Sequence, residues 1–214
     1  DQGDIVTEET AMIIDSYMNM MSERTTSNEF KAMTWGGQIL FVSLMFCCLF
    51  VYLKLYRLNS IDSKSQLIFI FSTLTLFAVI IGLYVEYTNW SVFMIPCAML
   101  AIAYRIFLDS RTAFMAYLVF VLATSIAVSM PYEYILLQTG TGLVAIYTLK
   151  ELSQRSQILR TTFMIFLTYS LIWISIQMIQ LESLENIDLK MFIYFAINSI
   201  LLLLIYPLLF VVEK

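Results

Sequence analysis

Uncharged polar residues inside apolar stretches are the residues of this sequence with the clearest chemical potential. The segment LQTGTGL, residues 137–143, contains Gln138, Gly140 and Gly142, and Asn198 lies within another apolar stretch. Side-chain amides of this kind hydrogen-bond to neighbouring helices, and glycines let two helix backbones approach closely. The pattern is typical of ordinary helix packing. Its alternative interpretation is a flexible or ligand-binding segment.

A compact group of charges interrupts the apolar sequence at RIFLDSRTAF, residues 105–114, and consists of Arg105, Asp109 and Arg111. Asp109 can cap a helix that starts after it, or it can pair with Arg105 at the i, i+4 spacing. Such a group is typical of a tight turn whose charges fix membrane topology. It also offers a docking surface for a partner on the same side of the membrane.

Catalytic and metal-binding groups are scarce. The 214 residues include no His, and no acidic or basic residue lies near the middle of a long apolar stretch. Metal sites and proton or ion pathways inside membranes depend on such residues. Cys47, Cys48 and Cys97 fit small packing residues in apolar surroundings. We therefore expect no catalytic residue, metal or cofactor within this chain, and no nucleic-acid partner.

The elements that hold these residues are predicted to be membrane-spanning helices. The chain is 60% hydrophobic and 13% charged, whereas soluble domains carry roughly 25% charged residues. A span needs about 20 mostly apolar residues, and seven stretches meet this requirement. They are approximately Gly36–Tyr56, Gln66–Val85, Trp90–Leu108, Thr112–Met130, Tyr134–Leu149, Thr161–Gln180 and Met191–Val212. The predicted fold is an all-α membrane protein with a seven-transmembrane helix bundle.

Prolines and aromatic residues add detail to these spans. Pro96 and Pro207 each remove a helix hydrogen bond, so they are expected to kink the third and seventh spans. Several aromatic residues near the predicted span ends fit the belt at the membrane–water boundary. They are Trp35, Tyr87, Trp90, Tyr132 and Tyr134.

The distribution of basic residues predicts the orientation of the bundle. If the first span runs from outside to inside, the inner side carries nine of the 12 Lys and Arg residues and the outer side three. The inner nine are Lys54, Arg57, Lys64, Arg105, Arg111, Lys150, Arg155, Arg160 and Lys214, and the outer three are Arg24, Lys31 and Lys190. Basic residues concentrate on the cytoplasmic side of membrane proteins. The N-terminus is therefore predicted outside, and the C-terminus and the Arg105–Arg111 turn inside.

The first residues differ from the rest of the chain. The segment TEETAMIIDSYMNMMSER, residues 7–24, has apolar residues at helical spacing behind Thr7, a plausible helix cap. We predict a short amphipathic helix outside the membrane. Residues 1–34 are then the end of an extracytoplasmic domain with a linker, and residues 35–214 are the transmembrane domain. The chain starts without Met and ends directly after an apolar run, so we expect it to be a piece of a longer protein.

Three longer segments carry a resemblance to a known family. They are FMIPCAMLAIAYRIFLDSRTAF (93–114), YEYILLQTGTGLVAIYTLKELSQRSQILRT (132–161) and FAINSILLLLIYPLLFVVEK (195–214). In this order they resemble the bacterial seven-transmembrane receptors with an intracellular HD hydrolase domain, in the form typical of Bacteroidetes. The motifs of G-protein-coupled receptors do not match, because Asn198 is not followed by Pro-x-x-Tyr and the third span does not end in Asp-Arg-Tyr.

The resemblance implies a larger protein in the bacterial cytoplasmic membrane. Such receptors have an external domain, seven helices and a metal-dependent HD phosphohydrolase, which would follow Lys214 and hold a divalent metal pair. Characterised relatives hydrolyse cyclic di-AMP. The implied partners are the lipid bilayer and the protein's own external and HD domains, and a homo-oligomer is compatible with this arrangement.

The expected function is therefore transmembrane signalling from an external sensor to an internal hydrolase. The alternatives are a transporter-like bundle that binds lipid or another small molecule, and a passive membrane anchor. A set of residues is expected to mediate helix packing or coupling. It comprises Arg105, Asp109, Arg111, Gln138, Gly140, Gly142, Asn198 and Pro207.

Overall fold

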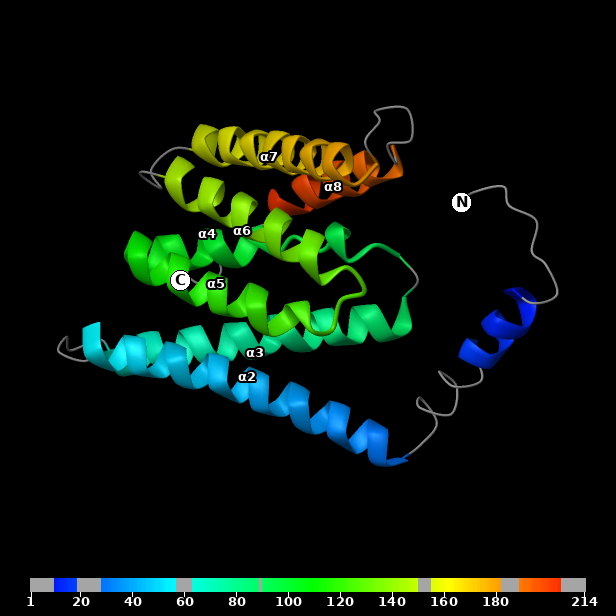
Figure 1. Cartoon of the computed structure of the whole chain (residues 1–214). Helices are drawn as coiled ribbons and strands as arrows, with labels where there is room; N and C mark the ends of the chain where they lie inside the picture. Colours follow the sequence, from blue (N-terminus) through cyan, green and yellow to red (C-terminus); the bar gives the residue numbers. More distant parts are fainter. Residues whose placement is uncertain are drawn as a thin grey trace. The chain divides into compact units, whose positions relative to one another are not determined.

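The computed structural model describes residues 10–18, 28–56, 63–88, 90–149, 155–181 and 189–204, and within these residues every element is helical. The elements after residue 27 are α2 (Asn28–Tyr56), α3 (Ser63–Tyr87), the short 3-10 helix η1 (Val92–Met94), α4 (Ala98–Phe107), α5 (Ser110–Ser125), α6 (Pro131–Thr148), α7 (Arg155–Leu181) and α8 (Lys190–Leu202). Figure 1 shows them along the chain. The chain divides into two compact units, residues 1–44 and residues 45–214.

The first unit contains a short helix over residues 10–18 and the beginning of α2. The short helix lies within the predicted amphipathic segment, and its apolar side chains, including Met12, Ile13 and Tyr17, are exposed. The predicted cap Thr7 lies outside the described residues. The position of this short helix outside the membrane stays a prediction.

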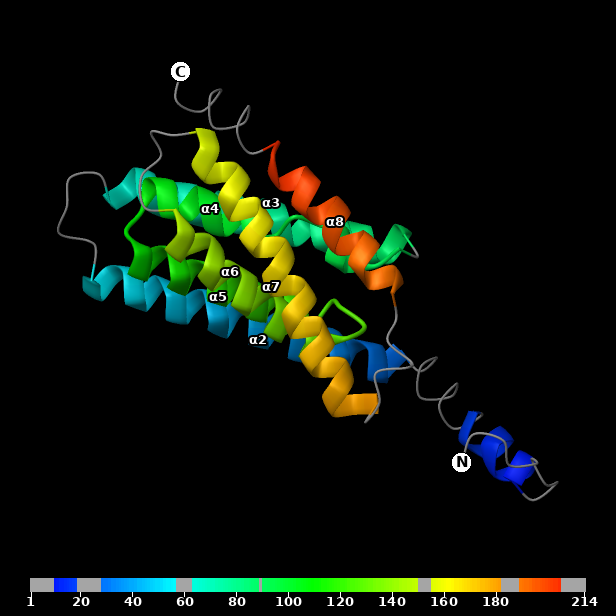
Figure 2. The same ribbon diagram turned by 90° about the horizontal axis from the view of Figure 1, so that it is seen from above.

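The second unit packs its helices around α4, α5 and α6. These three helices contact one another, and α3 packs against α4 and α5. On the other side α7 packs along α6, and α8 packs against α7 and η1. Figure 1 shows α4, α5 and α6 between α3 and the α7–α8 pair, and Figure 2 shows the same helices from above. The central helices α4, α5 and α6 are therefore enclosed by neighbours, and the inward faces of α3, α7 and α8 also contribute fully buried residues such as Leu74, Tyr169 and Asn198.

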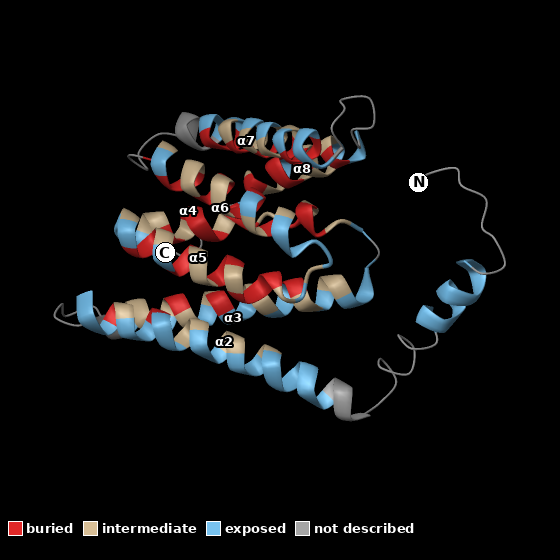
Figure 3. Ribbon diagram, in the orientation of Figure 1, coloured by how far each residue is buried: buried red, intermediate tan, exposed pale blue. Residues whose placement is uncertain are grey.

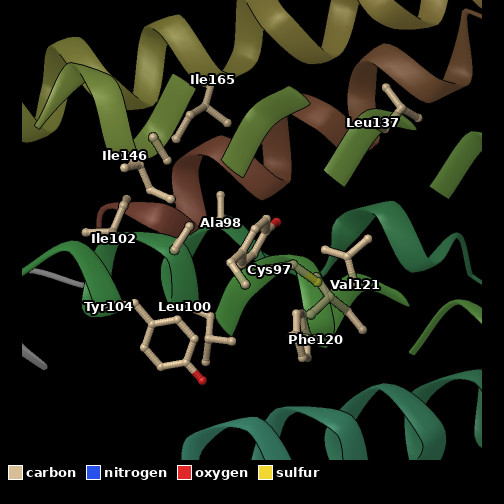
Figure 4. Close-up of a cluster of buried hydrophobic side chains, with 14 of the residues drawn as sticks. Cys97, Ala98, Leu100, Ile102, Tyr104, Phe120, Val121, Leu137, Ile146 and Ile165 are labelled. Atoms are coloured by element: carbon tan, nitrogen blue, oxygen red, sulfur yellow. The ribbon is translucent and has the colours of Figure 1, made fainter. Parts of the chain in front are cut away.

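Burial follows this arrangement. Buried residues concentrate on α4, α5, α6 and the inner faces of α7 and α8, as Figure 3 shows. Apolar side chains of α3 such as Ile68, Leu76 and Val79 remain exposed. In the close-up of the core, Cys97, Phe120 and Val121 lie near one another between the central helices (Figure 4). Large exposed apolar surfaces outside a packed centre are typical of helices that face lipid.

Within the part of the chain that the structure describes, three helices are long and apolar enough to cross a membrane: Ala32–Tyr56, Ser65–Tyr87 and Leu159–Gln180. The apolar helices Val92–Phe107, Ser110–Ser125 and Lys190–Leu202 are shorter. A helix of 16 residues such as α5 is about 24 Å long, which is less than the hydrocarbon thickness of about 30 Å. The predicted seventh span continues to Val212, and its last residues, with Pro207, lie outside the described residues.

The structure corrects the bounds of three predicted spans. The third is not one helix, because the backbone is extended at Ile95 between η1 and α4. The fourth ends at Ser125 instead of Met130, and the fifth begins at Pro131 instead of Tyr134. Proline disfavours helical backbone at the residue before it and needs no N–H donor in the first turn of a helix. Pro131 therefore starts α6 and excludes Met130 from helix.

Candidate functional site: the polar centre of the bundle

Gln138 is the hub of a hydrogen-bond network at the centre of the second unit. It lies on α6 and is fully buried. The hydroxyl of Tyr117 on α5 donates to Gln138 Oε1 at 3.1 Å, and the hydroxyl of Tyr169 on α7 donates to the same oxygen at 2.9 Å. One amide oxygen therefore joins α5, α6 and α7. Hydrogen bonds between membrane helices average about 0.6 kcal/mol each, so the network specifies packing more than it adds stability.

Gly142 makes this geometry possible. A Cβ atom on Gly142 would lie 2.0 Å from Cε1 and 2.4 Å from Cδ1 of Tyr117. The tyrosine ring thus lies directly on the α6 backbone, and any side chain at 142 would displace it. At Gly140 the nearest atom to a Cβ would be Cδ1 of Ile172 at 2.3 Å. That atom is the tip of a flexible side chain, so Gly142 is the more restricted of the two glycines.

A second polar group lies next to this network and includes Tyr134. Its hydroxyl lies 3.1 Å from Oγ1 of Thr124 on α5 and 3.8 Å from Sγ of Cys97. The prediction of Tyr134 as a membrane-boundary residue is wrong, because the side chain is fully buried. Tyr132, two positions earlier, is exposed. Tyr134 lies on the inner face of α6, since it shares the i, i+3, i+4, i+7 spacing with the buried residues Leu137, Gln138 and Thr141.

Asn198 donates hydrogen bonds to the backbone at the helix break next to Pro96. In the interruption between η1 and α4 the regular helix hydrogen bonds are lost, since Pro96 has no N–H. Nδ2 of Asn198, from α8, donates to the carbonyl oxygen of Phe93 at 2.7 Å and to that of Ile95 at 2.8 Å. Asn198 is fully buried. A buried carbonyl without a donor costs about 1–3 kcal/mol, so this amide stabilises a helix break inside the bundle.

Aromatic rings connect the helix break to the Gln138 network. The ring of Phe93 lies 6.3 Å from that of Tyr134, 6.4 Å from Trp173 and 6.2 Å from Phe195, measured between ring centroids. Phe195 on α8 also stacks on Tyr169 with a centroid distance of 5.1 Å and an interplanar angle of 14°. Tyr169 in turn holds Gln138. A displacement of η1 or α8 would therefore reach α6 and α7 through contacting side chains.

The charged turn lies at the opposite end of α4 from this break. Asp109 is the N-cap of α5, and its carboxylate accepts a hydrogen bond from the backbone N–H of Thr112 at 3.3 Å. Arg105 lies in the last turn of α4, where the helix dipole stabilises a positive charge. Arg111 is exposed. The structure confirms the helix-capping role that the position of Asp109 predicts.

The comparison with known families bears on this arrangement of helices. The family model described as 7TM receptor with intracellular HD hydrolase matches residues 32–214. The chain belongs to this family. No curated protein and no solved structure matches it. The resemblance to seven-transmembrane receptors with an intracellular HD hydrolase is thereby confirmed.

The polar centre of this 7TM receptor chain is built from uncharged groups. Among the residues that the structure describes, no group of three or more His, Cys, Asp or Glu residues could hold a metal ion. The network consists instead of tyrosine hydroxyls, two amides and a threonine. Such groups can position helices and exchange hydrogen bonds between two packings.

Of the predicted residues, the structure brings none of the charged ones to the centre. Gln138 and Gly142 both contact Tyr117, whereas Asn198 holds the carbonyl groups of Phe93 and Ile95. Arg105, Asp109 and Arg111 form the separate turn. Sequence reasoning missed the tyrosines Tyr117, Tyr134 and Tyr169. Their fully buried hydroxyls need partners, but the sequence does not distinguish a buried tyrosine from one that faces lipid.

Proposed function

We propose that this chain is the transmembrane signalling module of a bacterial receptor, and that it couples an extracytoplasmic sensor to a cytoplasmic HD phosphohydrolase. The observation that carries the proposal is the match to the 7TM receptor family over residues 32–214. The packing is consistent with it, because Gln138, Thr141 and Asn198 are fully buried. A transporter pathway would instead expose polar groups of this kind to a water-filled cavity.

The proposed topology has seven spans in the cytoplasmic membrane, with the N-terminus outside and the C-terminus inside. It rests on seven apolar helical segments, with η1 and α4 counted as one, and on the excess of basic residues at the predicted inner ends, nine against three. The turn with Arg105, Asp109 and Arg111 then faces the cytoplasm. The ends of α3 and α5 and the beginnings of η1, α6 and α8 face outward.

Cysteine labelling in intact cells tests this topology. In a variant with Cys47, Cys48 and Cys97 replaced, a cysteine at Ser129 is expected to react with a membrane-impermeant thiol reagent, because it is exposed in the outward α5–α6 turn. A cysteine at Arg111 is expected to react only after the cells are opened. Labelling of the Arg111 cysteine in intact cells would refute the orientation.

The hydrolase is proposed to degrade cyclic di-AMP with a divalent metal pair held in the HD domain. The helices would contribute no catalytic residue, since this chain contains no His. The proposed partners of the bundle are the lipid bilayer, the external domain, the HD domain and a second copy of the protein.

Replacement of Asp109 tests whether the inner turn transmits the signal. Asp109→Ala removes the carboxylate that caps α5. Loss of a helix cap lowers the free energy of unfolding by about 0.5–2 kcal/mol. In the full-length protein this change is expected to alter the cellular cyclic di-AMP level about fivefold, if the turn belongs to an element with two packings. The cyclic di-AMP level and the amount of receptor in the membrane are measured together in the same cells.

Asp109→Ser is the matched control, because serine also caps helices but carries no charge. A nucleotide level near wild type in the serine variant would assign the effect to the geometry of the turn. A changed level in both variants would assign it to the charge. If Asp109→Ala leaves the nucleotide level unchanged at equal abundance, the turn does not couple the bundle to the hydrolase.

A further inference from the structure

A pocket of about 450 Å³ lies where η1 meets the ends of α3 and α5 and the beginning of α8. Four separate segments of the chain contribute to it, with Thr88, Ser91, Ser129 and Met191 among its lining residues. Its volume falls within the range of about 300–1,000 Å³ that is typical of small-molecule sites. In the proposed topology all four segments lie at the outer face of the membrane.

The lining determines which ligand chemistry the pocket can accept. It contains no acidic or basic residue. Hydroxyl groups are present on Thr88, Ser91 and Ser129, whereas Phe93 and Met191 are buried apolar residues. A charged ligand would lose its water without gaining a counter-charge, which is costly. The lining therefore suits an uncharged molecule with hydroxyl groups and an apolar portion.

Two aromatic residues, Trp90 and Tyr194, also line this pocket. Trp90 is exposed and Tyr194 is half-buried. Both residue types are enriched at the level of the lipid headgroups because their rings are amphipathic. An amphiphile with its hydroxyl groups near Ser129 and its apolar portion along these rings would match both surroundings.

The pocket is also placed to influence the helix break. Ser91 is the N-cap of η1, and its hydroxyl lies 3.8 Å from Sδ of Met191 on α8. Phe93 lines the pocket, and its carbonyl oxygen accepts the hydrogen bond from Asn198. A molecule in the pocket would thus contact both η1 and α8, the two elements that Asn198 joins. A change in the distance between η1 and α8 would then move Phe93.

We propose that this pocket binds an uncharged, hydroxyl-bearing amphiphile, and that its occupancy alters the junction between η1 and α8. The placement of the pocket at the outer face rests on the proposed topology, whereas binding itself does not. The molecule can reach the pocket as a lipid from the outer leaflet or as a soluble glycoside from the water, since both offer the same chemistry.

Photo-crosslinking of the full-length receptor in lipid nanodiscs tests the proposal. The probe is a monoacylglycerol with a diazirine in its acyl chain, and a fatty acid with the same diazirine chain is the charged control. The expected result is that the monoacylglycerol labels peptides that contain Trp90, Met130 or Met191 and that the fatty acid labels them much less. Competition with unlabelled monoacylglycerol or with butyl glucoside then distinguishes a lipid source from a soluble one.

Two tryptophan variants provide the matched comparison. Ser129→Trp fills the pocket and is expected to reduce labelling about tenfold, equivalent to about 1.4 kcal/mol in affinity. Ser175→Trp introduces the same side chain at an exposed position on α7 that does not line the pocket, and labelling is expected to stay at the wild-type level. Thermal unfolding of both variants shows whether the fold is retained, and Ser129→Ala replaces Ser129→Trp if it is not.

Ser129→Ala removes only one hydroxyl and is expected to weaken competition by monoacylglycerol about fivefold. Equal labelling by the two probes, or labelling spread over exposed α3 residues with no preference for the pocket, would overturn the proposal. The cysteine-labelling experiment is independent of this one, so a wrong topology and a wrong ligand class give different results.

Discussion

Replacement of Gly142 with alanine is expected to lower the free energy of unfolding of the bundle by about 1–3 kcal/mol, the usual cost of an overpacked core. The new Cβ would lie 2.0 Å from the ring of Tyr117, which is fully buried and rigid. The ring must therefore move, and its hydroxyl then leaves Gln138 Oε1. Unfolding of the purified receptor in detergent or nanodiscs measures the change.

Gly140→Ala is the matched control, since it is the same substitution two positions earlier on the same helix. Its Cβ would meet only the terminal atom of Ile172, which can rotate away. Alanine is favoured over glycine in a helix interior by about 1 kcal/mol, so Gly140→Ala is expected to be neutral or stabilising. Equal destabilisation by both substitutions would contradict the assigned role of Tyr117.

A double substitution isolates the contact itself. If Gly142→Ala acts through Tyr117, its cost should largely disappear in a Tyr117→Ala background, because the ring that it displaces is absent. The interaction energy between two residues in direct contact is typically about 0.5–3 kcal/mol. Tyr117→Phe removes only the hydroxyl, and it separates the hydrogen bond to Gln138 from the steric effect.

The helices themselves could be predicted from the sequence, because a run of about 20 apolar residues has few alternatives in a membrane. Their ends were less predictable. Pro131 marks the start of α6, but the residues after Ser125 are as apolar as the helix before them, so the sequence carries no signal that α5 ends there. The break at Pro96 was expected only as a kink.

The polar centre was predictable in part. Gln138 and Asn198 were identified as amides that bond to other helices, because buried amides need partners. Their partners could not be identified, since Tyr117 and Tyr169 are 21 and 31 residues away from Gln138 and Phe93 is 105 residues away from Asn198. The difference between Gly140 and Gly142 likewise depends on which residue of another helix lies above each glycine.

Asn198→Asp is expected to have the largest effect of any single change considered for this receptor. The substitution keeps the shape of the side chain but replaces the donor Nδ2 with a carboxyl oxygen. That oxygen would face the carbonyl oxygens of Phe93 and Ile95, which lie 2.7 and 2.8 Å from Nδ2. A carboxylate would be repelled there, and a protonated carboxyl group could donate to only one of the two.

The expected loss in unfolding free energy is about 3–5 kcal/mol, as for other buried charges left without a partner. Ser199→Ala is the control at the neighbouring position, because Ser199 is buried and its hydroxyl has no hydrogen-bond partner among the described residues. It should change stability little. Asn198→Leu removes the donor without introducing a charge, and we expect its loss of unfolding free energy to lie between those of Asn198→Asp and Ser199→Ala.

The same variants separate a structural role of the helix break from a signalling role. Under the proposed function the receptor sets the cyclic di-AMP level through its hydrolase. If η1 and α8 only hold the bundle together, that level per folded receptor stays constant in Asn198→Leu, and only abundance falls. If the break transmits occupancy of the outer pocket to α6 and α7, the level per folded receptor changes, because Phe93 loses the bond that fixes it to α8. A ligand can shift an equilibrium only by its differential affinity for the two states. Loss of the Asn198 bond should therefore also abolish any response of the hydrolase to the monoacylglycerol probe, while labelling of the pocket remains.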